Sequence, residues 1–197
     1  MKLYYSPGAC SLSPHIVAAE AGIAVELEKV DLRTHTTQTG EDYYAINPKG
    51  YVPALVLDDG ALLTEGPAIV QYLADLKPQT GLLAPVGTFA RYKVVEWLTF
   101  TNSEIHKTFG TLFGKAPDEA KADAKARIAK RLETVSKGLG TQDYLTGGFT
   151  VADAYMFVML RWAGKMGIAL PDNLAGLSDR IAARSKVKAV LQQEGLD

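Results

Sequence analysis

The stretch MKLYYSPGACSLSPHIVAAEAG at residues 1–22 decides the fold. Residues 2–5 are mostly aromatic or apolar, and the turn sequence Ser-Pro-Gly at 6–8 follows them, which is typical of a short strand that ends in a turn. From Ile16 the residues are mainly apolar or small as far as Gly22, a residue type that commonly ends a helix in the left-handed conformation. The chain is therefore expected to open with a strand, a turn and a helix.

The residues that follow extend this unit. Loose alternation over 25–32 predicts a second strand, and a strand that follows a helix in this way forms a crossover unit. The polar stretch 33–50 predicts a loop with one short helix around 41–45. Strands over 52–57 and 61–64 flank the turn sequence Asp-Asp-Gly and are therefore expected to be antiparallel.

A further helix is expected to open at Gly66-Pro67 and to end before Pro78. The predicted fold class is thus α/β plus all-α. A thioredoxin-like βαβ-ββα domain covers residues 1–77, a linker covers 78–87, and an all-helical domain covers 88–197. The helices expected in the second domain cover 91–113, 118–137, 151–166 and 173–185.

The charge and the cysteine content of the sequence exclude several classes of function. The 197 residues carry 21 Lys plus Arg and 22 Asp plus Glu, a formal charge of −1, so no basic field points to nucleic acid or to an anionic membrane. The single cysteine, Cys10, excludes an intrachain disulfide and any multi-cysteine metal site. No secretory leader and no run of about 18 apolar residues occurs, so we expect a soluble cytoplasmic protein with no metal.

Cys10 lies in the turn between the first strand and the first helix. Free N–H groups and the helix dipole at this place would lower the pKa of a thiol from about 8.5 and favour thiolate chemistry. The alternative is a buried structural cysteine. Ser11 and Ser13 could cap the helix, and Pro14 fixes its start just after Cys10.

Two further motifs of the first domain could bind a peptide-like ligand. If the Val52-Pro53 bond is cis, the main chain of Val52 can pair with an extended peptide; the alternative is a simple proline at the start of a strand. With Gly66 as N-cap of its helix, the free N–H groups could hold a carboxylate and Glu65 an ammonium, which together suit an α-amino-acid head group. The alternative is an acidic residue that merely precedes a helix.

The second domain carries two polar patterns. A polar stripe on its first long helix is made of Asn102, Ser103, His106, Lys107 and Gly110. Thr150 and Asp153 have the spacing of a capping box, which predicts a structural role. A lone histidine is more often a structural residue than a catalyst, and no cluster of histidines and carboxylates suggests a metal site.

Taken together, five segments resemble the glutathione transferase family, and most closely its bacterial beta class. They are YYSPGACSLSPHI at 4–16, NPKGYVPALVLDDG at 47–60, LLTEGPAIVQYL at 62–73, NSEIHK at 102–107 and GGFTVADAY at 147–155. The resemblance covers the whole chain. It implies a homodimer, with glutathione as co-substrate in the cleft between the two domains.

The resemblance also implies roles for particular residues. Cys10 would approach the glutathione sulfur and could form a mixed disulfide with it, and His106 would take part from the helical domain. Ser11 and Tyr5 lie near the places where other classes keep a catalytic hydroxyl. The implied glutathione-binding residues are Ala9, Cys10, His35, Tyr51, Val52, Pro53, Glu65, Gly66, Asn102, Ser103, Glu104, His106 and Lys107. Val52 would pair with the cysteinyl unit, Glu65 and Gly66 would take the γ-glutamyl amine and carboxylate, and Glu104 would reach the site of the other subunit.

Two positions depart from the family pattern. Gly66 stands where many relatives have serine, so a hydroxyl contact to the γ-glutamyl carboxylate is missing. His35 stands where a cationic side chain toward the glycyl carboxylate is expected, and a neutral histidine would bind that group more weakly. We therefore expect modest affinity for glutathione.

The resulting hypothesis is an enzyme that stabilises the glutathione thiolate and delivers it to an apolar electrophile in detoxification or aromatic catabolism. Candidates for the electrophile site are Phe109, Phe113, Trp162 and Met166, although residues of this kind at helical spacing are also typical of a core. Two alternatives stay open. One is thiol–disulfide exchange or dehalogenation centred on Cys10; the other is a non-catalytic interaction protein that keeps the fold.

Overall fold

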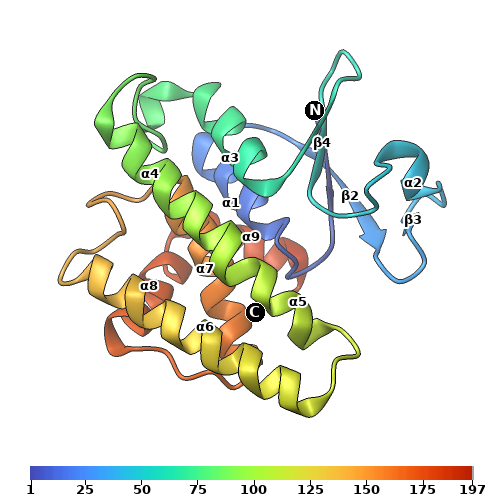
Figure 1. Ribbon diagram of the computed structural model, residues 1–197. Helices are drawn as coiled ribbons and strands as arrows, with labels where there is room; N and C mark the ends of the chain where they lie inside the picture. The colour runs from blue at the N-terminus through green and yellow to red at the C-terminus, as the bar shows by residue number, and fades with distance from the viewer. Residues whose placement is uncertain (197) are drawn as a thin grey trace. The chain divides into compact units, whose positions relative to one another are not determined.

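The computed structural model describes residues 1–196 (Figure 1). They form two compact units: Met1–Leu83 together with the segment that begins at Arg184, and Ala84–Ala183. The division at Leu83 falls inside the segment predicted as a linker. The last segment differs from the predicted boundaries, because it belongs to the first unit and not to the helical one.

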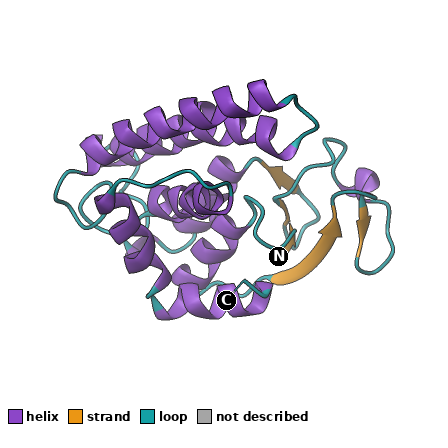
Figure 2. Cartoon of the chain, turned by 90° about the horizontal axis from the view of Figure 1, so that it is seen from below, coloured by secondary structure: helices purple, strands orange, loops and turns teal. Residues whose placement is uncertain are grey.

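The first unit is built on a five-stranded sheet with the order β3-β2-β1-β4-β5 (Figure 2). The strands are β1 (Lys2–Tyr5), β2 (Glu26–Asp31), β3 (Thr36–Thr37), β4 (Ala54–Val56) and β5 (Leu62–Thr64). β1 pairs in parallel with β2, and the other three pairings are antiparallel. The central strand β1 buries both Leu3 and Tyr4, whose side chains point to opposite faces of the sheet.

Helices α1 (Leu12–Ala21), α3 (Gly66–Asp75) and α9 (Ser185–Glu194) complete this unit with α2 (Tyr43–Ile46) and the short 3-10 helix η1 (Pro78–Thr80). α1 packs against both α3 and α9, and Figure 1 shows α1 and α3 side by side. Because it has two helical neighbours, α1 buries nearly all of its residues, including the polar His15. α3 instead buries one face, with Ile69, Val70 and Leu73.

The second unit contains only helices. They are α4 (Phe89–Phe100), the π-helix η2 (Thr101–His106), α5 (Lys107–Phe113), α6 (Asp118–Leu139), α7 (Val151–Lys165) and α8 (Asp172–Ala182). α7 is buried along almost its whole length and forms the core of the unit. α6 buries one face through residues at helical spacing, among them Ile128, Leu132 and Val135.

The predicted fold class is confirmed, with several local differences. β3 escaped prediction because a two-residue strand carries no pattern of its own. The helix expected over 91–113 is interrupted by η2, and the short helix expected around 41–45 lies at Tyr43–Ile46. The helix expected over 173–185 ends at Ala182, and the separate α9 was not predicted. The N-cap of α3 is Glu65, one residue earlier than expected.

Pairs of polar side chains hold α9 to α1. Arg184 donates from Nε and from an Nη to the two carboxylate oxygens of Glu20, at 2.7 and 2.9 Å. The His15 and Glu194 side chains are buried, with Nδ1 and Oε1 2.8 Å apart. These contacts join residues far apart in the chain, which explains why a local pattern did not reveal them. No helix among residues 1–196 is long and apolar enough to cross a membrane.

Candidate active site

The turn between β1 and α1 is held by Ser11. Its Oγ accepts a hydrogen bond from the Ser6 amide at 3.1 Å and donates one to the Ser6 carbonyl at 3.2 Å. Ser11 is fully buried, and although it occupies the N-cap position of α1 its side chain makes no capping bond. Ser13 is also no cap, because its hydroxyl donates to the Cys10 carbonyl. The Ser11 hydroxyl therefore shapes the loop that carries Cys10, and the expectation of a capping serine is wrong.

Cys10 is half-buried beside the segment that leads into β4 and contains Val52. Its Sγ–H donates to the Val52 carbonyl, with the sulfur 3.2 Å from the oxygen. Burial raises the pKa of the thiol to about 12, and this outweighs the hydrogen bonds from the backbone amides of Cys10 and Ser11, which lower it. The expectation that the helix start lowers the pKa of Cys10 is therefore wrong for the protein without bound glutathione. Cys10 is a thiol at neutral pH and acts as a hydrogen-bond donor.

The Val52-Pro53 bond, which the sequence left open, is cis. The preceding residue, Tyr51, is anchored through its carbonyl, which accepts hydrogen bonds from the Tyr43 hydroxyl at 2.8 Å and from Asn47 Nδ2 at 2.7 Å. The Tyr51 side chain itself is 73% exposed. Two buried side chains thus hold the main chain that leads into Val52.

Glu65 and Gly66 open α3 close to Pro53. Glu65 has a φ of +72°, a backbone conformation that is rare for a side chain other than glycine and is often found at functional sites. A Cβ added to Gly66 would lie 3.9 Å from Cγ of Pro53, an ordinary van der Waals contact. Space for a serine side chain at position 66 is therefore present.

Lys49 was not singled out from the sequence, although it lies in the NPKG segment. Its Nζ is 2.7 Å from Oε1 of Glu65 and donates to Oγ1 of Thr64 at 3.0 Å. The Glu65 carboxylate, expected to hold the amine of a ligand, thus already pairs with an ammonium group in the free protein. The pair is largely exposed, so its own contribution to stability is small.

Three other predicted site residues of the first unit make different contacts. His35 stacks on Tyr44 with ring centroids 4.4 Å apart, and its Nε2 lies 3.2 Å from the Tyr44 hydroxyl. Burial, and then the negative charge of Glu194, raises the pKa of Tyr5, so its phenol stays protonated. Ala9 donates its amide to the Ser6 carbonyl and stays half-buried in the turn. Cys10, Val52, Pro53 and Gly66 are the predicted residues that the structure brings together.

In the second unit, η2 positions Asn102 and His106. The hydroxyl of Tyr155, on α7, donates to Oδ1 of Asn102 at 2.9 Å and also contacts Nδ1 of His106. The His106 ring packs edge-on against Trp162, with centroids 5.1 Å apart. A π-helix frequently marks a functional site. Tyr155 was missed from the sequence because it lies in an otherwise apolar helix.

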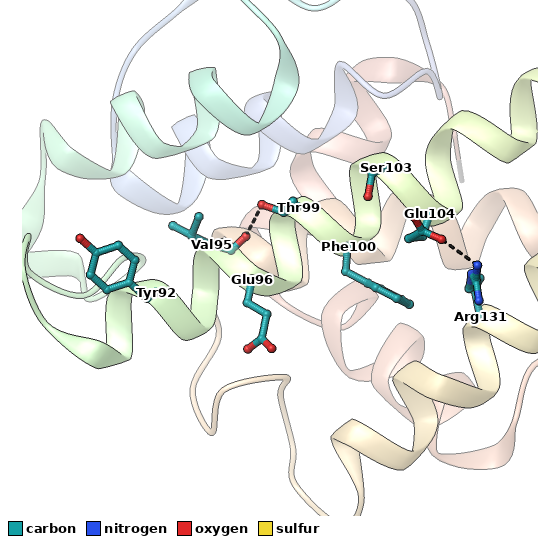
Figure 3. Close-up of a pocket in the computed structure, with 8 residues that line it drawn as sticks. All are labelled: Tyr92, Val95, Glu96, Thr99, Phe100, Ser103, Glu104 and Arg131. Atoms are coloured by element: carbon teal, nitrogen blue, oxygen red, sulfur yellow. Dashed lines mark hydrogen bonds and ion pairs between the residues drawn. The ribbon is translucent and has the colours of Figure 1, made fainter.

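Ser103 and Glu104, also predicted to bind glutathione, line a different feature. They lie in an open groove of about 630 Å³ along α4 and η2, together with Tyr92, Phe100 and Arg131 (Figure 3). The Glu104 carboxylate is 2.8 Å from a guanidinium nitrogen of Arg131 on α6. Lys107 is exposed at the start of α5. The residues of the expected polar stripe therefore lie in two places: Asn102 and His106 contact Tyr155, whereas Ser103 lines the groove.

The aromatic candidates form one cluster in the second unit. Trp162 meets Phe109 and Phe113 edge-on, with centroids 5.4 and 4.8 Å apart. Phe109 is fully buried and belongs to the core, whereas Phe113 is 51% exposed. Met166 is half-buried at the end of α7. Phe113 and the half-buried Met166 are therefore the candidates that could present an apolar surface to a ligand, whereas Trp162 is buried against Phe113.

The capping box predicted at Thr150 and Asp153 is present at the start of α7. The buried Asp153 carboxylate accepts hydrogen bonds from the amides of Thr150 and Leu145, each at 2.9 Å. This arrangement is structural. Among residues 1–196, no group of three or more histidine, cysteine, aspartate or glutamate side chains could hold a metal ion.

Comparison with protein families gives two matches. Residues 8–76 match the family model described as glutathione S-transferase, N-terminal domain, and residues 103–194 match glutathione S-transferase, C-terminal domain. A protein named glutathione S-transferase GstA from Escherichia coli O157:H7 is 47% identical over 200 residues that span the whole of both chains. Glutathione S-transferase GST-4.5 from Xanthomonas campestris is 39% identical, again over the whole of both chains.

Solved structures agree. A ternary complex of BphK, a bacterial glutathione S-transferase, superposes with a TM-score of 0.97 at 48% identity and full coverage of both chains. A beta-class enzyme from Sphingomonas chungbukensis gives a TM-score of 0.96 at 45% identity, also with full coverage of both chains. A sphingomonad glutathione S-transferase solved with glutathione gives the same two values and coverage.

Proposed function

Because the chain belongs to the glutathione S-transferase family, we propose that it conjugates the thiolate of glutathione to an apolar electrophile. The observation that carries the proposal is the grouping of Cys10, Val52, the cis-Pro53 and Gly66 in the first unit. A donor thiol, a main-chain segment available for pairing and a helix start form the set that a tripeptide thiol needs.

Glutathione would be bound through its peptide-like parts. Val52 would pair with the cysteinyl unit, the free amides at the start of α3 would take the γ-glutamyl carboxylate, and Glu65 would take the amine. Lys49 pairs with Glu65 in the free protein, so the incoming amine would replace one ammonium group with another. The charge balance at Glu65 would therefore be kept on binding.

Cys10 would act as a thiol that donates a hydrogen bond to the glutathione thiolate. The carbonyl of Val52 accepts this S–H in the free protein, so the proton is directed toward the segment before β4, where the cysteinyl unit of glutathione would bind. The pKa of Cys10, raised to about 12 by burial, supports this role over nucleophilic or redox chemistry at Cys10, which needs a thiolate. His106 would take part as the acid–base group of the reaction.

The aromatic cluster supports an apolar, and in particular an aromatic, electrophile. Phe113 is half-exposed, and its ring lies edge-on to Trp162, which also contacts the His106 ring. Aromatic side chains arranged edge to face offer both faces and edges to a planar ligand. An electrophile held beside His106 would be close to the group proposed to handle the proton.

A substrate screen tests the proposal. The purified protein is mixed with chloronitrobenzene with and without glutathione, and both the thioether product and oxidised glutathione are measured. The thioether should form only with glutathione. Cys10→Ala should lower its formation by no more than about tenfold, the effect of one hydrogen bond. Loss of all activity in Cys10→Ala, with oxidised glutathione as the product of the unsubstituted protein, would instead assign redox chemistry to Cys10.

We also propose that the protein is a cytoplasmic homodimer. Phe89 and Tyr92 on α4 are 80% and 61% exposed, and large apolar side chains on one helix commonly lie in an interface. The single cysteine is consistent with a reducing compartment. Sedimentation of the protein should give twice the mass of the chain, and Tyr92→Glu should shift it toward the monomer.

A further inference from the structure

Three side chains of the second unit form a continuous hydrogen-bonded chain. Asn102 and His106 come from η2 and Tyr155 from α7. Tyr155 is only 1% exposed, so its hydroxyl is placed by the packing of α7 and not by solvent. A buried hydroxyl needs hydrogen-bond partners, and Asn102 and His106 of the π-helix supply two.

The direction of these hydrogen bonds follows from the number of hydrogens available. The Tyr155 hydroxyl has one hydrogen, and it donates it to Oδ1 of Asn102, an atom that can only accept. The same hydroxyl oxygen must then act as acceptor toward Nδ1 of His106. Nδ1 therefore carries a hydrogen in both the neutral and the protonated imidazole, and a neutral His106 has no hydrogen on Nε2.

We propose that Tyr155 and Asn102 are positioning residues that fix the tautomer of His106, so that Nε2 is the nitrogen that gains and loses the proton. This inference deepens the proposed function and rests on it. The edge-on contact with Trp162 restricts the ring as well. Asn102 and His106 lie four positions apart in η2, so their side chains share one face of the helix and reach the same hydroxyl.

The proton of the reaction is then taken up and released at one atom, Nε2 of His106. Nε2 of neutral His106 accepts the proton of the glutathione thiol, and the resulting thiolate forms a bond to carbon of the electrophile. In a substitution, the bond from that carbon to its leaving group breaks, and the leaving group departs with the electron pair. The imidazolium afterwards returns its proton to solvent. The Nδ1–H bond to Tyr155 stays in place throughout and stabilises the imidazolium.

Nitrogen NMR tests the assignment directly. The chain has three histidines, so a long-range ¹H–¹⁵N spectrum of histidine-labelled protein can resolve each ring. The spectrum is recorded without glutathione, and the ring signal that is lost in His106→Gln belongs to His106. Above the pH at which His106 becomes neutral, we expect Nδ1 to be protonated and Nε2 to be bare. A hydrogen on Nε2 instead would mean that the chain of hydrogen bonds runs in the opposite direction, and it would overturn the proposal.

Two variants and a matched control test whether Tyr155 and Asn102 fix the tautomer of His106. Tyr155→Phe removes the acceptor and should move the hydrogen of His106 to Nε2, and Asn102→Ala should do the same because the Tyr155 hydroxyl can then donate to Nδ1. Tyr92→Phe removes a hydroxyl from an exposed position of the same unit and should leave the tautomer unchanged. An unchanged tautomer in both Tyr155→Phe and Asn102→Ala would overturn the proposal.

Kinetics supplies the second readout. Tyr155→Phe should lower kcat for conjugation about tenfold, the effect of one hydrogen bond, and leave KM for glutathione within about twofold. A rise in KM at constant kcat would contradict a role in positioning His106. If the unsubstituted protein conjugates nothing, the proposed function fails, whereas the NMR result still decides whether Tyr155 fixes the tautomer.

Discussion

At the scale of single residues, the protonation of Cys10 decides what chemistry the first unit can do. A thiol at a helix start is commonly activated, but here burial works in the opposite direction and raises the pKa to about 12. The sulfur donates a hydrogen bond to the carbonyl of Val52. A protonated Cys10 in the free protein supports the proposed role of hydrogen-bond donor over that of nucleophile.

The raised pKa of Cys10 predicts slow alkylation. Only the thiolate reacts with iodoacetamide, and a group with a raised pKa is ionised only as the pH approaches that higher value. We expect the rate for the folded protein to stay low up to about pH 9, where an ordinary cysteine with a pKa of about 8.5 is mostly ionised. Because Cys10 is the only cysteine, the mass of the protein reports the rate.

The unfolded protein in denaturant is the control for this measurement, and it should react with the pH dependence of a free thiol. An inflection for the folded protein near pH 7 would contradict the assignment of Cys10 as a hydrogen-bond donor.

A serine in place of Gly66 is expected to increase the affinity for glutathione. A Cβ at this position would lie 3.9 Å from Cγ of Pro53, an ordinary van der Waals contact. Gly66→Ser therefore adds a hydroxyl donor toward the proposed γ-glutamyl carboxylate without a clash, and it should lower KM for glutathione about two- to tenfold. Steady-state kinetics measures the change.

Gly66→Ala is the matched variant, since it adds the same Cβ without the hydroxyl. Equal KM values for the serine and alanine variants would show that the hydroxyl meets no carboxylate and would contradict the proposed mode of glutathione binding.

At the scale of elements, the π-helix η2 is the least regular part of the second unit and the part most closely tied to the proposed function. It lies between α4 and α5, where the sequence pattern predicts one continuous helix. Asn102 and His106 face the Tyr155 hydroxyl, whereas Ser103 and Glu104 lie in the groove along α4 and η2.

If one residue is deleted from η2, we expect the protein to lose activity and to retain its fold. Removing Ser103, which is exposed, should convert the π-turn into an α-turn and reduce the spacing of Asn102 and His106 from four positions to three, which moves one of them away from the Tyr155 hydroxyl. The link through Tyr155 would break. Conjugation should fall at least about tenfold, the effect of one lost hydrogen bond, while the helical circular-dichroism signal persists; full activity in the deletion variant would contradict a role for the π-turn.

The capping box of α7 predicts a large effect on stability. The Asp153 carboxylate accepts hydrogen bonds from two backbone amides and from the Thr150 hydroxyl, all in a buried place. Asp153→Ala leaves these donors unpaired and should lower the free energy of unfolding by about 2–4 kcal/mol. Denaturant titration measures the loss, and Asp172→Ala, at the first turn of α8, is a control with a small expected effect. A loss for Asp153→Ala no larger than that of the control would contradict the structural role.

At the scale of the whole molecule, the two ends of the chain meet in one unit. Glu194, near the end of α9, pairs with His15 and accepts a hydrogen bond from the Gly8 amide at 2.9 Å. Gly8 lies two residues before Cys10, so the last helix supports the loop that carries the thiol. The fold of the first unit is therefore completed only when the last helix is in place.

Removal of the Glu194 carboxylate tests this support. The buried Glu194 carboxylate accepts from the Gly8 amide and lies 2.8 Å from Nδ1 of His15, so Glu194→Ala leaves buried polar groups without this partner and should lower the free energy of unfolding by about 1–3 kcal/mol for each. Glu26→Ala removes a carboxylate from the exposed pair with Lys2 and should change stability little. Thermal unfolding of the two variants makes the comparison, and equal midpoints would contradict the role assigned to Glu194.

Much of the fold could be predicted because its signals are local. The turn after Tyr5, the end of α1 at Gly22 and the capping box at Thr150 each depend on residues within a few positions of one another. The candidate site was predicted in part for the same reason, since Cys10, Val52 and Gly66 lie in short motifs. α9 and Lys49 were missed because their roles depend on contacts with distant residues.

The amino-acid sequence by itself determined the order of most strands and helices, the all-helical character of the second unit and the residue types of the site, since these follow from the periodicity and turn chemistry of neighbouring residues. Only the tertiary structure decided the protonation of Cys10, the pairing of Glu194 with Gly8 across 186 positions and the link from His106 to Tyr155 across 49. The physical reason is that burial and hydrogen-bond direction are set by groups that the folded chain brings together, and no local pattern contains them.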